Sequence, residues 1–219
     1  WHVGPMGLLQ TLADAVKLLT KEVLTPERAE PWAYWIAPIV VFVPGIFVLV
    51  VIPFTPELVV SRLDLSLLYV FALPAVSVVG FIMAGWGSGS KYALLGGIRL
   101  VAQAVSYEIP LLFSVVGVAI LTGSLSLIDI VNAQGDTVWY GVVQPVAFVI
   151  FIMAGLAEHS RTPFDMAVGE SEVMGGPTIE YSGIRWAMFM LAEYVNIFIL
   201  ASLGTIIFLG GWHGPVLPG

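Results

Sequence analysis

The sequence predicts an all-α polytopic membrane protein, and its composition is the first observation behind this prediction. Apolar residues make up 58% of the 219 residues and charged residues only 11%, whereas about a quarter of the residues in an average soluble protein are charged. The mean hydropathy is +0.97, and a soluble chain of this size cannot hide so much apolar surface from water. The composition therefore excludes a soluble enzyme. An excess of 15 Asp and Glu over 8 Lys and Arg excludes a basic nucleic-acid-binding protein.

Five stretches without charged residues are the second observation, and they place the membrane-spanning helices along the chain. Each holds about 20 residues or more, which at about 1.5 Å per residue is enough to cross a hydrocarbon core of about 30 Å. Prolines inside these stretches, such as Pro145, are expected to kink or interrupt helices. Within one membrane domain at 31–219, the predicted spans lie near residues 31–56, 65–90, 109–128, 137–157 and 186–212, the last of which begins before its charge-free stretch at 194–219.

Residues 1–30 precede this domain and contain an amphipathic segment over residues 8–23. One face is polar, with Gln10, Asp14, Lys17 and Lys21 at helical spacing, and the opposite face is apolar. The segment is too polar to span a bilayer, so we expect an interfacial helix that lies along the membrane surface.

The positive charges predict the orientation of the chain. The segments before the first span, between the second and third spans, and between the fourth and fifth spans must share one side of the membrane. They hold seven of the eight positive charges, which are Lys17, Lys21, Arg28, Lys91, Arg99, Arg161 and Arg185. The positive-inside rule predicts that this side is cytoplasmic.

The carboxylates gather in and after the loop at 158–185, which is long and acidic. Closely spaced carboxylates repel one another, which favours the protonated form of some of them and makes them usable for proton transfer. A solvated acidic surface is the alternative interpretation. Glu193 favours a functional role for these carboxylates over a solvated surface, because a carboxylate inside an apolar span is a functional candidate by default. The acidic residues of this region are Glu158, Asp165, Glu170, Glu172, Glu180 and Glu193.

Glu108 is a further acidic candidate, at the point where the segment 91–110 meets the third predicted span. Pro110 suits the first turn of a helix, so we expect Glu108 beside a helix N-terminus, where the helix dipole favours its anionic form. Anchoring of the membrane edge by a charged flank is the alternative interpretation.

The chain has no cysteine, which excludes iron–sulfur ligation and disulfide bonds. Its three histidines, His2, His159 and His213, do not form the pair at membrane depth that a b-type haem requires. We therefore expect that this chain does not itself carry electrons and binds no metal.

Three blocks of sequence resemble the family of H-type membrane subunits of respiratory complex I (NADH:quinone oxidoreductase), which lie where the hydrophilic and membrane arms meet. The blocks are GPMGLLQTLADAVKLLTKE at 4–22, GWGSGSKYALLGGIRLVAQAVSYEIP at 85–110 and AEHSRTPFDMAVGESEVMGGPTIEYSG at 157–183. The resemblance covers essentially the whole chain. It implies that the five predicted spans correspond to the second to sixth of the eight spans of that family.

The resemblance implies that the protein takes part in quinone reduction coupled to translocation of protons or sodium ions. It implies that Glu108, Glu158 and Glu193 are intramembrane proton relays. It also implies that the loop forms part of a quinone-access chamber through Arg161, Asp165, Glu170, Glu172, Glu180 and Tyr181.

The resemblance further implies which molecules surround the chain. Quinone is the expected substrate, while the iron–sulfur clusters, FMN and NADH are expected on partner subunits. The expected partners are the hydrophilic-arm iron–sulfur and quinone-site subunits, small membrane subunits, antiporter-like subunits and the lipid bilayer of an energy-transducing membrane, the bacterial plasma membrane.

The chain departs from the family pattern at a few positions. Val168 stands where the family usually has another glutamate, Pro177 where it commonly has an aromatic residue, and His159–Ser160 where it has a Thr–Asn type pair. The alternatives are the homologous membrane component of a membrane-bound hydrogenase or of a ferredoxin- or deazaflavin-linked complex, and a free-standing ion channel or transporter. The intact GESE and EYSG strings favour the quinone-linked branch.

Overall fold

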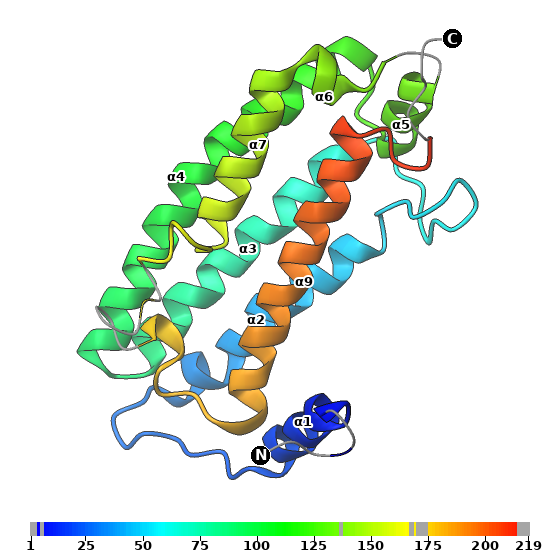
Figure 1. Cartoon of the computed structure of the whole chain (residues 1–219). Helices are drawn as coiled ribbons and strands as arrows, with labels where there is room; N and C mark the ends of the chain where they lie inside the picture. The colour runs from blue at the N-terminus through cyan, green and yellow to red at the C-terminus, as the bar shows by residue number, and fades with distance from the viewer. Residues whose placement is uncertain (1–3, 5–6, 136–137, 167–168, 170–174, 214–219) are drawn as a thin grey trace.

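The computed structural model describes residues 4, 7–135, 138–166, 169 and 175–213. These residues form helices joined by loops and contain no β-strand, which confirms the predicted fold class (Figure 1). Four of the described helices are long and apolar enough to cross a membrane. They are α2 (Pro31–Leu49), α3 (Ser66–Gly87), α4 (Lys91–Thr122) and α9 (Gly183–Phe208).

The third predicted span begins much earlier than the charge pattern indicates. Helix α4 runs without interruption from Lys91 to Thr122 and continues through Pro110. Glu108 therefore lies in the middle of a helix, and the expectation that it lies beside a helix N-terminus is wrong. The charged residues of 91–110 misled the prediction, because a long helix can hold a few charges when it extends past the apolar layer or lines a cavity.

The fourth predicted span is divided into two helices. Helix α6 (Tyr140–Val143) ends at Val143, and α7 (Pro145–Glu158) begins one residue later, after Gln144. Pro145 has no N–H to donate, which suits the first position of a helix but not its interior. Next to this break, the Gln144 side-chain amide donates a hydrogen bond to the Gly117 carbonyl of α4 at 3.3 Å.

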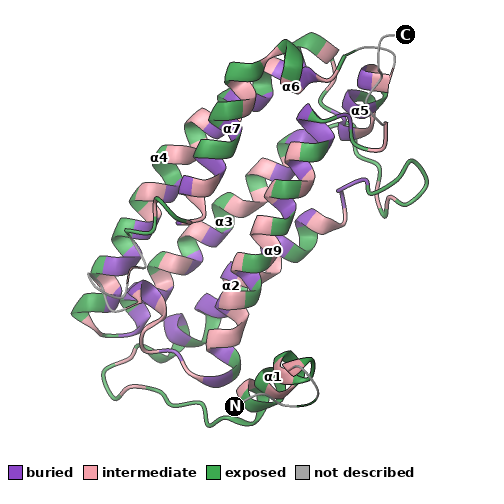
Figure 2. Ribbon diagram, viewed as in Figure 1, coloured by how far each residue is buried: buried purple, intermediate pink, exposed green. Residues whose placement is uncertain are grey.

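The long helices form an elongated bundle in which α2 packs along α3, α7 along α4, and α9 against α2 (Figure 1). Buried residues face the interior between helices, while much of the outer surface is exposed and apolar (Figure 2). Phe113 and Ile120, for example, are 73% and 75% exposed. An outer surface of this kind suits lipid or other membrane helices rather than water.

Helix α1 (Gln10–Thr20) lies across the end of the bundle and contains no buried residue. Its apolar side chains, including Leu12 and Leu19, are exposed, as an interfacial helix requires. The segment after it is fixed to the start of α9, where the Leu24 N–H donates to the Ser182 hydroxyl at 3.1 Å. Two segments predicted to share one side of the membrane therefore lie at the same end of the bundle.

Candidate functional site

Gln103 of α4 forms hydrogen bonds with the end of α7 and with the loop that follows it. The Gln103 side-chain amide donates to the carbonyl of Ala157 at 2.6 Å and to the carbonyl of Phe164 at 2.8 Å. Next to this contact, the Tyr107 and Phe164 rings lie 5.6 Å apart. Because these bonds hold both ends of 157–164, they fix the part of the loop that carries Glu158.

The chain turns sharply at the end of α7. The N–H groups of His159 and Ser160 donate to the carbonyls of Gly155 and Ala157, and Ser160 has a φ of 48°. A left-handed backbone is uncommon for a residue other than glycine, so hydrogen bonds around it are needed to keep this turn. The turn leaves Glu158 and His159 facing the bundle interior and directs the following residues toward its surface.

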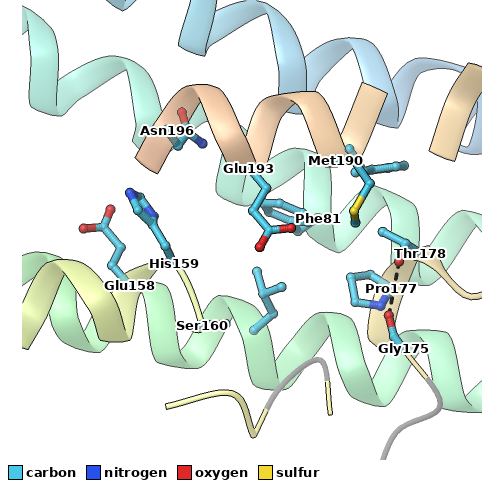
Figure 3. A pocket seen from close by; sticks show the side chains of 12 residues that line it. Phe81, Glu158, His159, Ser160, Gly175, Pro177, Thr178, Met190, Glu193 and Asn196 are labelled. Carbon is cyan, nitrogen blue, oxygen red and sulfur yellow. Dashed lines mark hydrogen bonds between the residues drawn. The ribbon is translucent and has the colours of Figure 1, made fainter. Parts of the chain in front are cut away.

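Glu158 and Glu193 line one cavity between α7, α9 and the loop, which we call cavity A (Figure 3). Its volume is about 80 Å³. Figure 3 shows the Glu193 side chain reaching into it from α9, with Pro177 and Thr178 further along. The Glu158 Oε2 atom is buried without a hydrogen-bond partner among the described residues, which leaves it available to a water molecule or a proton donor.

A second, smaller cavity continues from the first toward α4. This cavity B, of about 30 Å³, is lined by Glu108, Glu158, His159 and Asn196 together with apolar residues of α3, α4 and α9. Glu108 also lines a third cavity, C, of about 270 Å³ between α3 and α4, whose other lining residues are apolar. The three predicted relay carboxylates therefore line a row of adjoining cavities, with Glu158 shared by A and B and Glu108 shared by B and C.

The sizes of these cavities indicate what they can hold. A water molecule needs a cavity volume of about 10–15 Å³, whereas pockets for cofactors and drug-sized ligands measure about 300–1,000 Å³. Cavities A and B are therefore large enough for water molecules beside the carboxylates and too small for a quinone ring. Among the described residues, no group of three or more His, Cys, Asp or Glu side chains is placed to hold a metal ion.

Arg161 connects the loop to α9 by an ion pair. Its guanidinium lies 2.9 Å from a Glu193 carboxylate oxygen, and the two side chains are 36% and 32% exposed. The same guanidinium lies 5.5 Å from the centre of the Tyr194 ring, a cation–π distance. Two residues predicted from different parts of the sequence are thus brought together.

The other predicted loop residues that the structure describes do not line these cavities. Asp165 is exposed. The Glu180 backbone carbonyl accepts a hydrogen bond from the Tyr34 hydroxyl at 2.7 Å, and the buried Tyr181 ring stacks on the Tyr34 ring at 4.3 Å. Burial raises the pKa of Tyr181, so its hydroxyl stays protonated. Glu170 and Glu172 lie outside the described residues.

Three polar residues of the site were not predicted: Gln103, His159 and Asn196. Burial lowers the pKa of His159 to about 4, and the Arg161 charge lowers it further, while a backbone hydrogen bond to Asn196 opposes the shift. The imidazole is therefore neutral at physiological pH. A signal existed for Asn196, because it is an isolated amide in the apolar segment 194–212.

The substitution Gln103→Leu tests whether this amide fixes the loop. It should leave the Ala157 and Phe164 carbonyls without donors, which costs about 1–3 kcal/mol for a buried group. We expect faster hydrogen–deuterium exchange over 158–166 in nanodiscs, with α3 unchanged.

Ser106→Ala is the matched control on the same helix face, because the Ser106 hydroxyl donates only to the Ala102 carbonyl of its own helix. It should leave the loop as protected as in the parent protein. Equal loop exchange in the Gln103→Leu protein and the parent would refute the anchoring role.

Comparison with known proteins agrees with these sequence features. A family model described as NADH dehydrogenase matches residues 1–218. The chain is 53% identical over 210 residues to the H subunit of the NADH-quinone oxidoreductase of Geobacillus kaustophilus (strain HTA426), covering 96% of this chain and 63% of that protein. It is 52% identical over 211 residues to the H subunit of the same enzyme of Brevibacillus brevis (strain 47 / JCM 6285 / NBRC 100599), covering 96% and 62%.

The chain therefore spans somewhat less than two thirds of the length of these relatives. The match nevertheless extends over nearly all of its own residues and includes every part of the candidate site. The resemblance drawn from the three sequence blocks is confirmed, and the chain belongs to the NADH dehydrogenase family.

Proposed function

We propose that this chain is the H-type membrane component of an NADH:quinone oxidoreductase, and that it carries protons away from the quinone-reducing end of the complex. The observation that carries this proposal is the row of cavities. Glu193 and Glu158 line cavity A, Glu158 and Glu108 line cavity B, and Glu108 lines cavity C. Each carboxylate can exchange a proton with the next through water in the cavity that both of them line.

Arg161 supplies the electrostatic control in this proposal. Its charge favours the anionic form of Glu193 through the 2.9 Å ion pair. Unit charges a few ångströms apart interact by about 1–4 kcal/mol between bulk water and an effective dielectric constant of about 20. A proton that reaches Glu193 weakens this attraction, and the arginine is then free to turn toward other charges. Reduction of a quinone consumes two protons, and this demand changes the charge beside the loop.

The quinone itself is proposed to lie outside cavities A and B, which are too small for its ring. Arg161 and Asp165 reach the bundle surface next to cavity A, and we place the chamber there, between this surface and the hydrophilic-arm subunits. FMN, NADH and the iron–sulfur clusters reside on those partners in this proposal. The small membrane and antiporter-like subunits receive the protons or sodium ions, and the positively charged loops face the cytoplasm.

Purification of the intact protein from its native membrane tests the assignment to this complex. Co-purification with iron–sulfur and antiporter-like subunits, together with NADH-driven quinone reduction, supports the proposal. A lone protein that transports ions would refute the proposal. A complex that uses hydrogen, ferredoxin or a reduced deazaflavin as its electron donor would refute the assignment of NADH as the donor.

Glu193→Gln tests the relay within that complex. A half-exposed ion pair contributes only about 0–1 kcal/mol of stability, so the complex should assemble normally. Loss of an acid–base group should reduce coupled quinone reduction and proton pumping by roughly tenfold or more. Electron transfer from NADH to a soluble acceptor should not change.

Glu57→Gln is the matched control, because Glu57 is exposed in the loop between α2 and α3 and belongs to none of the three cavities. Pumping at the parent rate in the Glu193→Gln protein would show that Glu193 is not a relay.

A further inference from the structure

His159 occupies the boundary between two cavities that the proposed proton path must cross. Cavities A and B have three lining residues in common, which are Glu158, His159 and Asn196. A proton that moves from the Glu193 side to the Glu108 side must therefore pass among these three side chains. Figure 3 shows the His159 ring between the Glu158 side chain and Asn196 of α9.

The backbone fixes this position of the imidazole. His159 directly follows the last residue of α7, and its N–H donates to the Gly155 carbonyl at 3.2 Å. The backbone of Asn196 in α9 lies close enough to the ring to favour its protonated form. The ring thus lies between the end of α7 and α9, and the free nitrogen of the neutral ring is a hydrogen-bond acceptor.

Of the three shared residues, only Glu158 and His159 can take up a proton and release it again, because the Asn196 amide does not titrate. The charged and titratable groups around the ring are Arg161 of the loop and the carboxyls that line the same cavities, which are Glu158 of α7, Glu193 of α9 and Glu108 of α4. A ring that rested as the imidazolium cation would have no free nitrogen to accept a proton. The low pKa of His159 keeps the resting ring neutral and the path open.

We infer that His159 is a proton-relay residue that works with Glu158 to join cavity A to cavity B. This inference rests on the proposed function. In the transfer step, the free ring nitrogen forms an N–H bond as the O–H bond of a protonated group or water in cavity A breaks. The same N–H bond then breaks as a water or carboxylate in cavity B takes the proton. The ring is neutral before and after the step, and no other reactant is needed.

The test replaces the ring in two ways within the intact complex in inverted membrane vesicles. His159→Gln keeps a polar side chain that donates and accepts hydrogen bonds but cannot take up a proton. His159→Ala removes the ring and leaves space for added imidazole. We expect both variants to lose roughly tenfold or more of NADH-driven proton pumping, with electron transfer to a soluble acceptor unchanged. Added imidazole should restore pumping several-fold in the alanine variant only.

His213→Gln is the matched control, because His213 lies against Gly135 beside α5 and lines none of the three cavities. Normal pumping in His159→Gln would overturn the inference, since a ring that only positions Glu158 can be replaced by an amide. Absence of imidazole rescue in an assembled His159→Ala complex would overturn it as well. Should His159→Ala not assemble, the glutamine variant decides alone.

Glu158→Gln, measured in parallel, separates this inference from the proposed function. A defective Glu158→Gln protein beside a normal His159→Gln protein refutes only the role of the histidine. Normal pumping in Glu158→Gln refutes the relay itself.

Discussion

Glu158→Gln should reduce coupled quinone reduction by about 10²–10⁴-fold, the usual contribution of a positioned acid–base group. Glu158 lines both cavities A and B, and it is the only carboxylate among the described residues that does so. Glutamine has nearly the same shape, and the complex should therefore assemble. The rates to measure are NADH-driven proton pumping and quinone reduction in vesicles, beside NADH oxidation by a soluble acceptor.

Glu158→Asp is the informative companion to this variant. It keeps the carboxylate but withdraws it by one methylene group, so pumping should be partly retained. A Glu158→Gln protein that pumps normally would show that protons do not pass through this residue. Equal loss in both variants, with NADH oxidation intact, would show that the position of the carboxylate matters as much as its chemistry.

Gly96→Ala should displace the wall of cavity A and destabilise the protein. A Cβ atom at Gly96 would lie 2.5 Å from the Gly176 Cα and 2.9 Å from the Gly176 carbonyl carbon. Gly176 begins the 3₁₀ turn η2 (Gly176–Thr178), which carries Pro177 and Thr178 of the cavity lining. Helix propensity alone favours alanine by about 1 kcal/mol. The clash with Gly176 outweighs this gain in helix propensity, because the Gly176 backbone cannot rotate away as a side chain can.

The expected net cost is about 1–3 kcal/mol, as for other overpacked sites, and it should appear as a lower thermal transition of the purified complex. Gly117→Ala is the matched control on the same helix. Its Cβ would meet only the tip of the flexible Gln144 side chain, at 3.1 Å. A Gly96→Ala complex as stable as the Gly117→Ala complex would show that the η2 turn is free to move.

The charge-free stretches were sufficient to predict the helical membrane fold, but not where each helix ends. Helix α2 stops at Leu49 and α4 begins at Lys91, because hydrophobicity locates the lipid layer while helix ends depend on local hydrogen bonds. The short helix α5 (Leu127–Gly135) was not predicted. Only contacts with neighbouring helices distinguish such a helix from the end of a span.

Only part of the site was predicted, because the sequence shows residue types but not how the helices pack. Acidic residues in an apolar sequence stand out, so Glu108, Glu158 and Glu193 could be selected before their positions were known. Packing decides which helix faces meet. His159 and Asn196 therefore became candidates only when the structure showed that both line cavities A and B. Packing likewise places Tyr181 against Tyr34 rather than on those cavities.

The bonds between the segment after α1 and the start of α9 also bear on how the chain is made. The Tyr34 hydroxyl donates to the Glu180 carbonyl, 146 residues later in the sequence, and Ser182 bonds to both Glu22 and Leu24. Synthesis proceeds from the N-terminus at about 5–20 residues per second, so these partners reach the membrane several seconds after α1 does. The bonds that fix the segment after α1 to the start of α9 therefore form only after the intervening helices α2 to α7 have been translated.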